Sequence, residues 1–352
     1  MRRLLSPFAL LYRGVIGARN LYYDHVPGAT HHADLPVVSV GNLTVGGTGK
    51  TPLVIALVQK LQASDHRPAI LTRGYKTPPG GTADEVLEFH EALPSVPVIV
   101  NPARVAGAAE ARQQHNVDCL VLDDGFQHRR LARDLDIVLI DALYPWGSFS
   151  QPAWKARDGI PHHVCTSSGP HLLPAGHLRE PPGSLRRADV LVLTRADLVA
   201  RAHLACVTDE VQHYAGEKPV LNAVVEPDAL VYRDGRRAPP AELAGRHVVG
   251  VCGIGNPEQF HLFLRGLAGH EHPTFGYADH CQYSPANVRE IQRRAATEKA
   301  DLVVTTRKDW VKLAPLWPDS GPGLVRLDVR LELGGAVNEL DARLRQAVEK
   351  RL

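Results

Sequence analysis

The chain has 352 residues, enough for two domains, and 44% hydrophobic with 22% charged residues is a composition typical of a folded globular protein. A formal net charge of +2 gives no field that would favour nucleic acid, so we expect no nucleic-acid partner. The five cysteines form no Cys-x-x-Cys pair, so neither a disulfide framework nor a structural zinc site is indicated, and no apolar run approaches the roughly 18 residues of a membrane span.

Residues 1–24 form a basic amphipathic segment without an acidic residue before Asp24. Leu4, Phe8, Leu11 and Val15 recur at helical spacing. A signal peptide is disfavoured, because an arginine interrupts the apolar stretch and no Ala-x-Ala cleavage pattern follows. Two interpretations remain open and are compatible: a helix that lies on an anionic membrane surface, and a helix that packs against its own domain.

A glycine-rich loop follows an apolar strand predicted at residues 37–40 and precedes a helix predicted at 52–58. Strand, loop, Lys-Thr and helix is the order of a phosphate-binding loop, in which backbone N–H groups and a helix N-terminus face the anion. The strict pattern has glycine at position 44, where this chain has threonine, and a plain glycine turn is the alternative. The predicted nucleotide-binding residues are Thr44, Val45, Gly46, Gly47, Thr48, Gly49, Lys50 and Thr51.

Further apolar strands are predicted at residues 68–72, 98–101, 119–122, 137–140 and 190–194, with helical segments such as 104–115 between them. This alternation predicts a mostly parallel sheet covered on both faces. Residues 143–183 are rich in Pro, Gly, His and Ser and are predicted to form a long loop.

An Asp-Gly turn within residues 230–237 predicts a β-hairpin, after which a second α/β pattern begins. We therefore expect an α/β protein with four parts. These are a basic amphipathic helix in 1–24, a P-loop domain in 25–225, a hairpin linker in 226–242, and a smaller α/β domain with a C-terminal helix in 243–352; the resemblance described below implies that the first is a membrane-contact helix and the second a kinase domain.

Asp123 and Asp124 close a buried strand, where α/β sheets bind ligands. Beside a P-loop, this is the place of the aspartate that holds Mg²⁺ directly or through water. A helix cap plus a turn is the alternative. Gln127 and His128 follow at once and are candidates for a phosphate or sugar contact, although His128 also fits a surface histidine.

Asp84 and Glu85 open an acidic helical stretch after the second strand. Helix capping explains both residues, but an adjacent carboxylate pair can also supply a base and a metal ligand. Asp279 and His280 lie in a loop of the second domain, where a histidine beside a carboxylate can move a proton. Arg179 and Glu180 follow a rigid turn and are either a phosphate contact with a metal neighbour or a surface ion pair.

Residues 194–197 are similar to the base-reading motif of GTPases, but Arg195 stands where lysine is expected, and the Asp-x-x-Gly switch is absent. We therefore interpret this segment as a strand end and a turn.

Taken together, these segments resemble the tetraacyldisaccharide 4′-kinase family, the lipid A 4′-kinases of Gram-negative bacteria. The resemblance spans about residues 1–313. It is carried by residues 39–52, 73–75, 84–85, 123–134, 173–176, 178–180, 253–257, 279–280, 305–306 and 308–309.

The resemblance implies an ATP- and Mg²⁺-dependent kinase that phosphorylates the 4′-hydroxyl of a tetraacyl glucosamine disaccharide 1-phosphate, the lipid A precursor. It also implies a peripheral position on the cytoplasmic side of the inner membrane, and no obligate protein partner is expected. By position, Asp84 is the catalytic aspartate, helped by His280 and, on the phosphate side, by Lys50.

Other roles follow from the loop motif and the strand end for Thr51 and Asp123, and from the resemblance for the remaining residues. Metal-side candidates are Thr51, Glu85, Asp123 and Asp124, and weaker site candidates are Arg104, Gln127, His128, Arg179 and Glu180. The chain departs from the family pattern at Ala83 and Val86 beside the Asp-Glu pair, at His177 in place of proline, and in the longer segment 145–171.

Because His280 belongs to the second domain, we expect domain closure to complete the site. The alternative function is a P-loop GTPase or switch ATPase that acts on a partner protein at the membrane. A nucleotide sensor without catalysis is disfavoured by the joint presence of Lys50, Asp84 and Asp124.

Overall fold

The computed structural model describes residues 2–74, 82–147, 156–157, 160–161, 171–255, 257–279 and 281–350. These residues fall into two compact units. Unit 1 comprises residues 1–74, 95–224 and 331–352, and unit 2 comprises residues 75–94 and 225–330. The division departs from the boundaries expected from sequence at two places, since residues 75–94 group with unit 2 and the C-terminal residues 331–352 group with unit 1.

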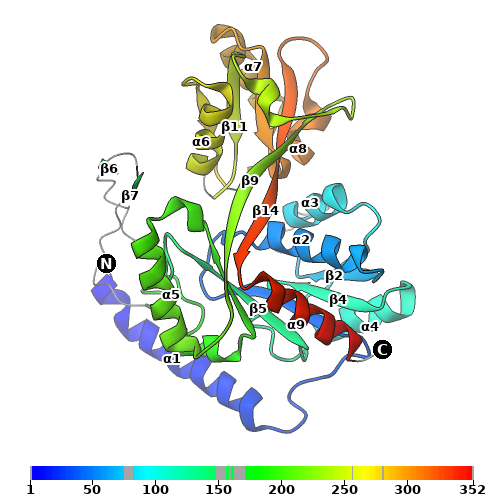
Figure 1. Ribbon diagram of the computed structural model, residues 1–352, viewed down its shortest axis with the longest axis vertical. Helices are drawn as coiled ribbons and strands as arrows, with labels where there is room; N and C mark the ends of the chain where they lie inside the picture. Colours follow the sequence, from blue (N-terminus) through cyan, green and yellow to red (C-terminus); the bar gives the residue numbers. More distant parts are fainter. Residues whose placement is uncertain are drawn as a thin grey trace. The chain divides into compact units, whose positions relative to one another are not determined.

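Unit 1 is built on a parallel sheet with the strand order β9-β8-β5-β1-β4-β2-β3 (Figure 1). Its strands are β1 (Val37–Asn42), β2 (Pro68–Thr72), β3 (Val98–Val100), β4 (Cys119–Asp123), β5 (Leu135–Asp141), β8 (Val190–Thr194) and the first part of β9 (Val220–Tyr232). Every residue of β1, β4, β5 and β8 is buried, so both faces of the sheet are covered, as predicted for parallel strands with continuous apolar runs.

The helices of unit 1 are α1 (Arg2–His25), α2 (Lys50–Ala63), α4 (Arg104–Gln114), α5 (Arg201–Ala215) and α9 (Val337–Glu349), with 3₁₀ turns η1 (Pro182–Arg187) and η2 (Ala196–Leu198). α2 and α9 both pack on β1. α9 joins this unit because Leu340, Leu344 and Val348 are buried. That tertiary contact, which the sequence pattern did not reveal, accounts for the placement of the C-terminal segment.

Unit 2 contains four neighbouring parallel strands in the order β12-β11-β13-β14, which are β11 (Val248–Cys252), β12 (Thr274–Gly276), β13 (Leu302–Thr306) and β14 (Gly323–Gly335). Its helices are α3 (Asp84–Ala92), α6 (Pro257–Ala268), α7 (Pro285–Thr297) and α8 (Arg307–Leu313), with 3₁₀ turns η3 (Pro240–Leu243) and η4 (Ala314–Leu316). The predicted hairpin is present, since β10 (Arg237–Ala238) pairs antiparallel with β9.

Several elements are longer than predicted or were missed. β9 begins ten residues before the predicted hairpin, at Val220, and β14 extends to Gly335, because their half-buried or exposed residues give no apolar run. α5 and α8 were not predicted. The long loop expected at 143–183 lies partly outside the described residues, but β6 (Ala156–Arg157) pairs with β7 (Ile160–Pro161), and residues 182–187 form η1.

The N-terminal helix packs on unit 1 through one side only. Tyr12 packs against a buried cluster that includes Val207 and Val211 of α5, and its hydroxyl donates to the backbone oxygen of Arg179 at 2.9 Å. Other side chains of α1 stay exposed, with 61% of Phe8 and 70% of Leu11 accessible. Among the described residues, no helix is long and apolar enough to cross a membrane.

Candidate active site

The nucleotide loop, residues 44–51, leaves β1 and enters α2. Gly46 and Gly49 have φ angles of +117° and +81°, which side chains other than glycine rarely adopt, and Lys50 is the first residue of the helix. The N-terminal N–H groups of α2 therefore open toward the loop, the arrangement that favours an anion. A glycine loop between strand and helix is present at the predicted residues, and its binding of nucleotide stays a prediction.

Three contacts in unit 1 fasten this loop. Thr44 forms a β-bridge with Leu178, and the Val45 N–H donates to the carbonyl oxygen of His177 at 2.9 Å. The Asn42 side chain donates to the carbonyl oxygen of Thr44 at 2.9 Å. The loop is thus held at its first two residues by the chain that follows the cis Leu173–Pro174 turn.

Arg195, at the end of β8, holds the loop from the other side. Its guanidinium donates to the carbonyl oxygen of Gly47 at 2.8 Å and forms an ion pair with Asp141 at the end of β5. Burial raises the pKa of Asp141, and Arg195 opposes that shift. We interpreted residues 194–197 only as a strand end and turn, so sequence reasoning missed this role of Arg195.

Lys50 lies between two oxygen acceptors. Its Nζ atom donates to Asn42 Oδ1 at 3.2 Å and lies 3.4 Å from Asp124 Oδ1. Arg179 makes a second ion pair with Asp124, at 2.8 Å. Burial alone would raise the pKa of Asp124, but the two cations lower it below its ordinary value. Asp124 therefore stays ionised beside the nucleotide loop.

Asp123 is more enclosed than Asp124. It is buried at the end of β4 and accepts a hydrogen bond from the Thr72 hydroxyl at 3.2 Å. Burial raises its pKa. Arg104, itself buried, donates to the backbone oxygen of Asp123 at 3.3 Å and to that of Asn101 at 2.8 Å, so it braces this strand end.

The donor set suits ATP with Mg²⁺. Thr48 Oγ1 is buried in the loop and has no hydrogen-bond partner among the described residues, which fits a hydroxyl that awaits a phosphate oxygen. Within the described part of the chain, no three or more His, Cys, Asp or Glu side chains form a metal cage. Mg²⁺ does not need one, since it commonly takes one or two carboxylates together with phosphate oxygens and water.

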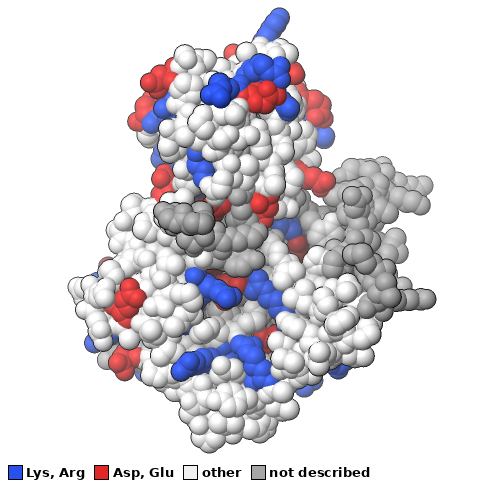
Figure 2. Space-filling model, turned by 180° about the vertical axis from the view of Figure 1, so that it is seen from behind, with Lys and Arg blue, Asp and Glu red and all other residues white. Residues whose placement is uncertain are grey.

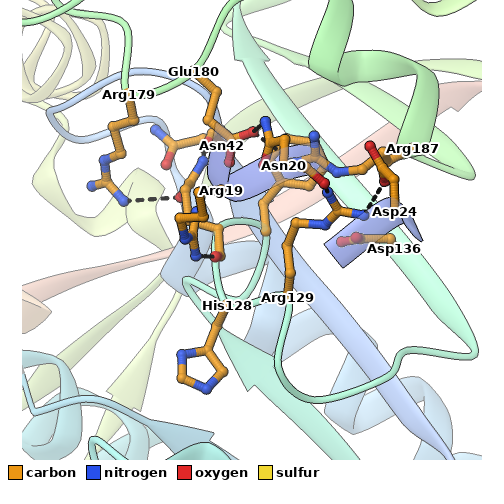
Figure 3. A network of polar contacts seen from close by, with 12 residues as sticks. Arg19, Asn20, Asp24, Asn42, His128, Arg129, Asp136, Arg179, Glu180 and Arg187 are labelled. Atoms are coloured by element: carbon orange, nitrogen blue, oxygen red, sulfur yellow. Dashed lines mark hydrogen bonds and ion pairs between the residues drawn. The ribbon is translucent and has the colours of Figure 1, made fainter. Parts of the chain in front are cut away.

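The second-rank candidates lie in different surroundings, and Figure 3 labels three of them, His128, Arg179 and Glu180. Gln127 donates to the backbone oxygen of Asn42 at 2.9 Å, so it lies beside the Lys50 contacts. Glu180 is fully buried and accepts from Asn20 of α1 at 3.0 Å and from Arg187 at 2.9 Å, so its charge anchors α1. Burial and nearby arginines lower the pKa of half-buried His128 to about 4, which leaves its ring neutral near pH 7.

The remaining predicted residues belong to unit 2. Asp84 is the first residue of α3, is buried, and lies 3.0 Å from the ammonium group of Lys312. Glu85 is half-buried beside it. His280 lies outside the described residues. The sequence did not predict a role for Lys312, because a lysine on a short helix is usually a solvent-exposed side chain.

Figure 2 shows several Lys and Arg side chains near one another on the larger part of the molecule, with a few acidic side chains among them. Such a grouping suits anionic substrates. Together with the parallel sheet, the nucleotide loop and the carboxylates after β4, it defines a P-loop nucleotide-binding protein of the phosphoryl-transfer class.

Comparison with known proteins identifies the family within this class. The family described as Tetraacyldisaccharide-1-P 4′-kinase matches residues 1–162 and 166–349. A tetraacyldisaccharide 4′-kinase of Syntrophus aciditrophicus is 36% identical over 89% of this chain and 84% of its own length. One of Halothermothrix orenii is 32% identical over 95% of this chain and 90% of its own length.

A solved structure agrees with these relatives. The crystal structure of "apo" form LpxK from Aquifex aeolicus in complex with ATP has a TM-score of 0.72 and 29% sequence identity, and the match covers 99% of each chain. The present chain belongs to the tetraacyldisaccharide-1-phosphate 4′-kinase family, and it is an ATP-dependent kinase. The switch-GTPase alternative is not favoured.

Proposed function

We propose that this chain transfers the γ-phosphoryl group of ATP to the 4′-hydroxyl of a tetraacyl glucosamine disaccharide 1-phosphate, with Mg²⁺, at the cytoplasmic face of the inner membrane. The observation that carries the nucleotide part is Lys50, whose ammonium group lies 3.2 Å from Asn42 and 3.4 Å from Asp124 at the head of α2. The acceptor follows from the family to which the chain belongs.

Phosphoryl transfer needs positioning and charge neutralisation more than covalent help. Lys50 and the first N–H groups of α2 would face the β- and γ-phosphates. Mg²⁺, when bound, would neutralise phosphate charge, and Thr51, Asp123 and Asp124 would hold it directly or through water. Asp124 is suited to this role because its lowered pKa keeps it ionised. Glu85 remains a further metal-side candidate.

Asp84 would accept the proton of the attacking 4′-hydroxyl. A positioned base of this kind contributes about 10²–10⁴-fold to the rate. An alcohol and an aspartate are poorly matched in pKa, so we expect His280 to assist the proton transfer. Arg179 and Gln127 are proposed to contact a phosphate or sugar. Arg179 forms an ion pair with Asp124, and Gln127 donates to the backbone oxygen of Asn42, so both lie beside the contacts of Lys50.

The exposed side of α1 is proposed to contact the membrane. Phe8, Leu10, Leu11 and Val15 are each more than half exposed, and Arg13 is exposed beside them. An apolar surface with basic neighbours binds anionic bilayers without crossing them. The acylated substrate would then be reached from the bilayer surface.

The test is transfer of label from ATP to the tetraacyl disaccharide 1-phosphate in mixed micelles containing Mg²⁺. We expect a labelled bisphosphate lipid with wild-type protein and loss of at least 100-fold in kcat with Asp84→Asn. His280→Ala is expected to lower kcat by a smaller factor. Hydrolysis of GTP in preference to ATP, with no labelled lipid, would overturn the proposal.

A further inference from the structure

Helix α3 is carried by unit 2, although its residues are inserted between β2 and β3 of the unit 1 sheet. α3 packs on α8, as Figure 1 shows. In the described part of the chain, ion pairs of Asp84 with Lys312 and of Glu91 with Arg326 join α3 to the rest of unit 2. The proposed base therefore depends on unit 2 for its position.

The Asp84–Lys312 pair is more enclosed than most ion pairs. The side chains of Asp84 and Lys312 are 4% and 6% exposed, and their charged atoms lie 3.0 Å apart. A buried ammonium group is costly unless it is paired, so Lys312 has little freedom to leave this position. Its Nζ atom also lies 5.8 Å from the centre of the Tyr283 ring, within reach of a cation–π contact.

A second carboxylate, that of Asp309, also lies near the ammonium group of Lys312. Asp309, fully buried, lies 3.9 Å from Lys312 Nζ. Asp309 is itself held by three donors: the Gly253 N–H at 2.8 Å, the Tyr283 hydroxyl at 3.0 Å and the Thr306 hydroxyl at 2.8 Å. Lys312 thus connects Asp84 to the ends of β11 and β13, where these partners lie.

The start of α3 lacks the usual local restraint. Ala83 occupies the N-cap position and provides no side-chain hydrogen bond, so the first turn is not fixed by capping. Asp84 is the first residue of that turn. The carboxylate of Asp84 accepts a hydrogen bond at 3.0 Å from Lys312, a residue 228 positions away in the chain.

From these contacts we infer that Lys312 is a positioning residue for the reaction, which holds the carboxylate of Asp84 in the orientation that accepts the proton of the substrate hydroxyl. The inference rests on the proposed function of Asp84. Lys312 would act through Asp84, with which it forms its ion pair. Its loss should lower kcat and leave ATP binding unchanged.

The control comes from the same helix. Glu91 joins α3 to Arg326, but it lies at the other end of α3 and is 40% exposed. If any anchor of α3 served equally, then Glu91→Gln would reduce kcat as Lys312→Met does. If Lys312 acts on the base itself, then Glu91→Gln affects only thermal stability.

The experiment measures kcat, KM for ATP, KM for lipid and Tm in full-length Lys312→Met, Lys312→Arg and Glu91→Gln. We expect kcat to fall about 10- to 100-fold in Lys312→Met, because this change removes one charge-assisted hydrogen bond to Asp84. The KM for ATP should change less than twofold. Lys312→Arg should recover part of kcat, and Glu91→Gln should keep it. Should Lys312→Met not fold, Lys312→Gln is judged by the same criteria.

Asp84→Asn is measured in parallel. A kcat for Lys312→Met within threefold of wild type, or an equal loss in Glu91→Gln, overturns the inference. When this happens while Asp84→Asn is inactive, the base assignment stands and only the role of Lys312 fails. Substantial activity in Asp84→Asn would instead refute the proposed function itself.

Discussion

Replacing Arg195 with alanine is expected to weaken ATP binding, although Arg195 is not one of the predicted nucleotide-binding residues. The change removes the hydrogen bond to the Gly47 carbonyl oxygen, 2.8 Å long, and the ion pair with Asp141. The nucleotide loop then keeps its attachments at Thr44 and Val45 but loses the one at its glycines. The backbone N–H groups that cradle the phosphates become less well ordered before ATP binds.

The magnitude follows from the bond that is lost. A hydrogen bond from a charged donor contributes about 1.5–3 kcal/mol, and about 1.4 kcal/mol corresponds to a tenfold change in affinity. We therefore expect the Kd for ATP to rise about 10- to 100-fold. The side chain of Asp141 is 8% exposed, so without Arg195 its pKa should rise further and the carboxyl should take up a proton, which limits the loss of stability.

The assay is equilibrium binding of a fluorescent ATP analogue in the absence of lipid, with Tm recorded for each variant. Lys60→Ala is the matched control, because Lys60 pairs with Asp341 at 2.5 Å near the far end of α2. It should change Tm without changing the Kd. Arg195→Lys should bind ATP with intermediate affinity, since lysine cannot reach both acceptors with one planar group. Binding of ATP by Arg195→Ala within twofold of wild type would refute the reasoning.

Three further predictions concern stability, the membrane and pH. A methyl group on Gly125 would meet Ser39 Oγ at 2.5 Å, so Gly125→Ala should lower the free energy of unfolding by about 1–3 kcal/mol, whereas Gly183→Ala, with nothing within 4 Å, should not; denaturant titration compares them. Leu11→Asp, on the exposed side of α1, should reduce co-sedimentation with anionic vesicles while ATP binding is kept; equal sedimentation would contradict membrane contact by α1. Because burial lowers the pKa of His128 to about 4, the unfolded chain binds its proton first. The neutral His128 ring therefore favours the folded state fully above about pH 6.5, and this contribution to the free energy of unfolding should decline as the pH falls toward 4. An NMR titration of His128 with a midpoint near 6.5 would contradict the prediction.

The sequence by itself determined the nucleotide loop and the strands around it. Glycines at the turn, Lys50 and Thr51 at fixed spacing and continuous apolar strands are local signals, and their chemistry admits few alternatives. Asp123 and Asp124 were found in the same way, since they directly follow an apolar strand. The half-buried strand β9 and the exposed end of β14 were missed because such residues carry no apolar pattern.

Only the tertiary structure decided which residues hold these groups in place. Arg195 meets Gly47 across 148 residues of sequence, and Lys312 meets Asp84 across 228. A lysine or an arginine in the sequence does not predict such a buried partner, because the same residue types are common on solvent-exposed surfaces. The grouping of α3 with unit 2 was likewise set by packing on α8, for contacts between distant segments depend on how the whole chain folds and leave no local pattern.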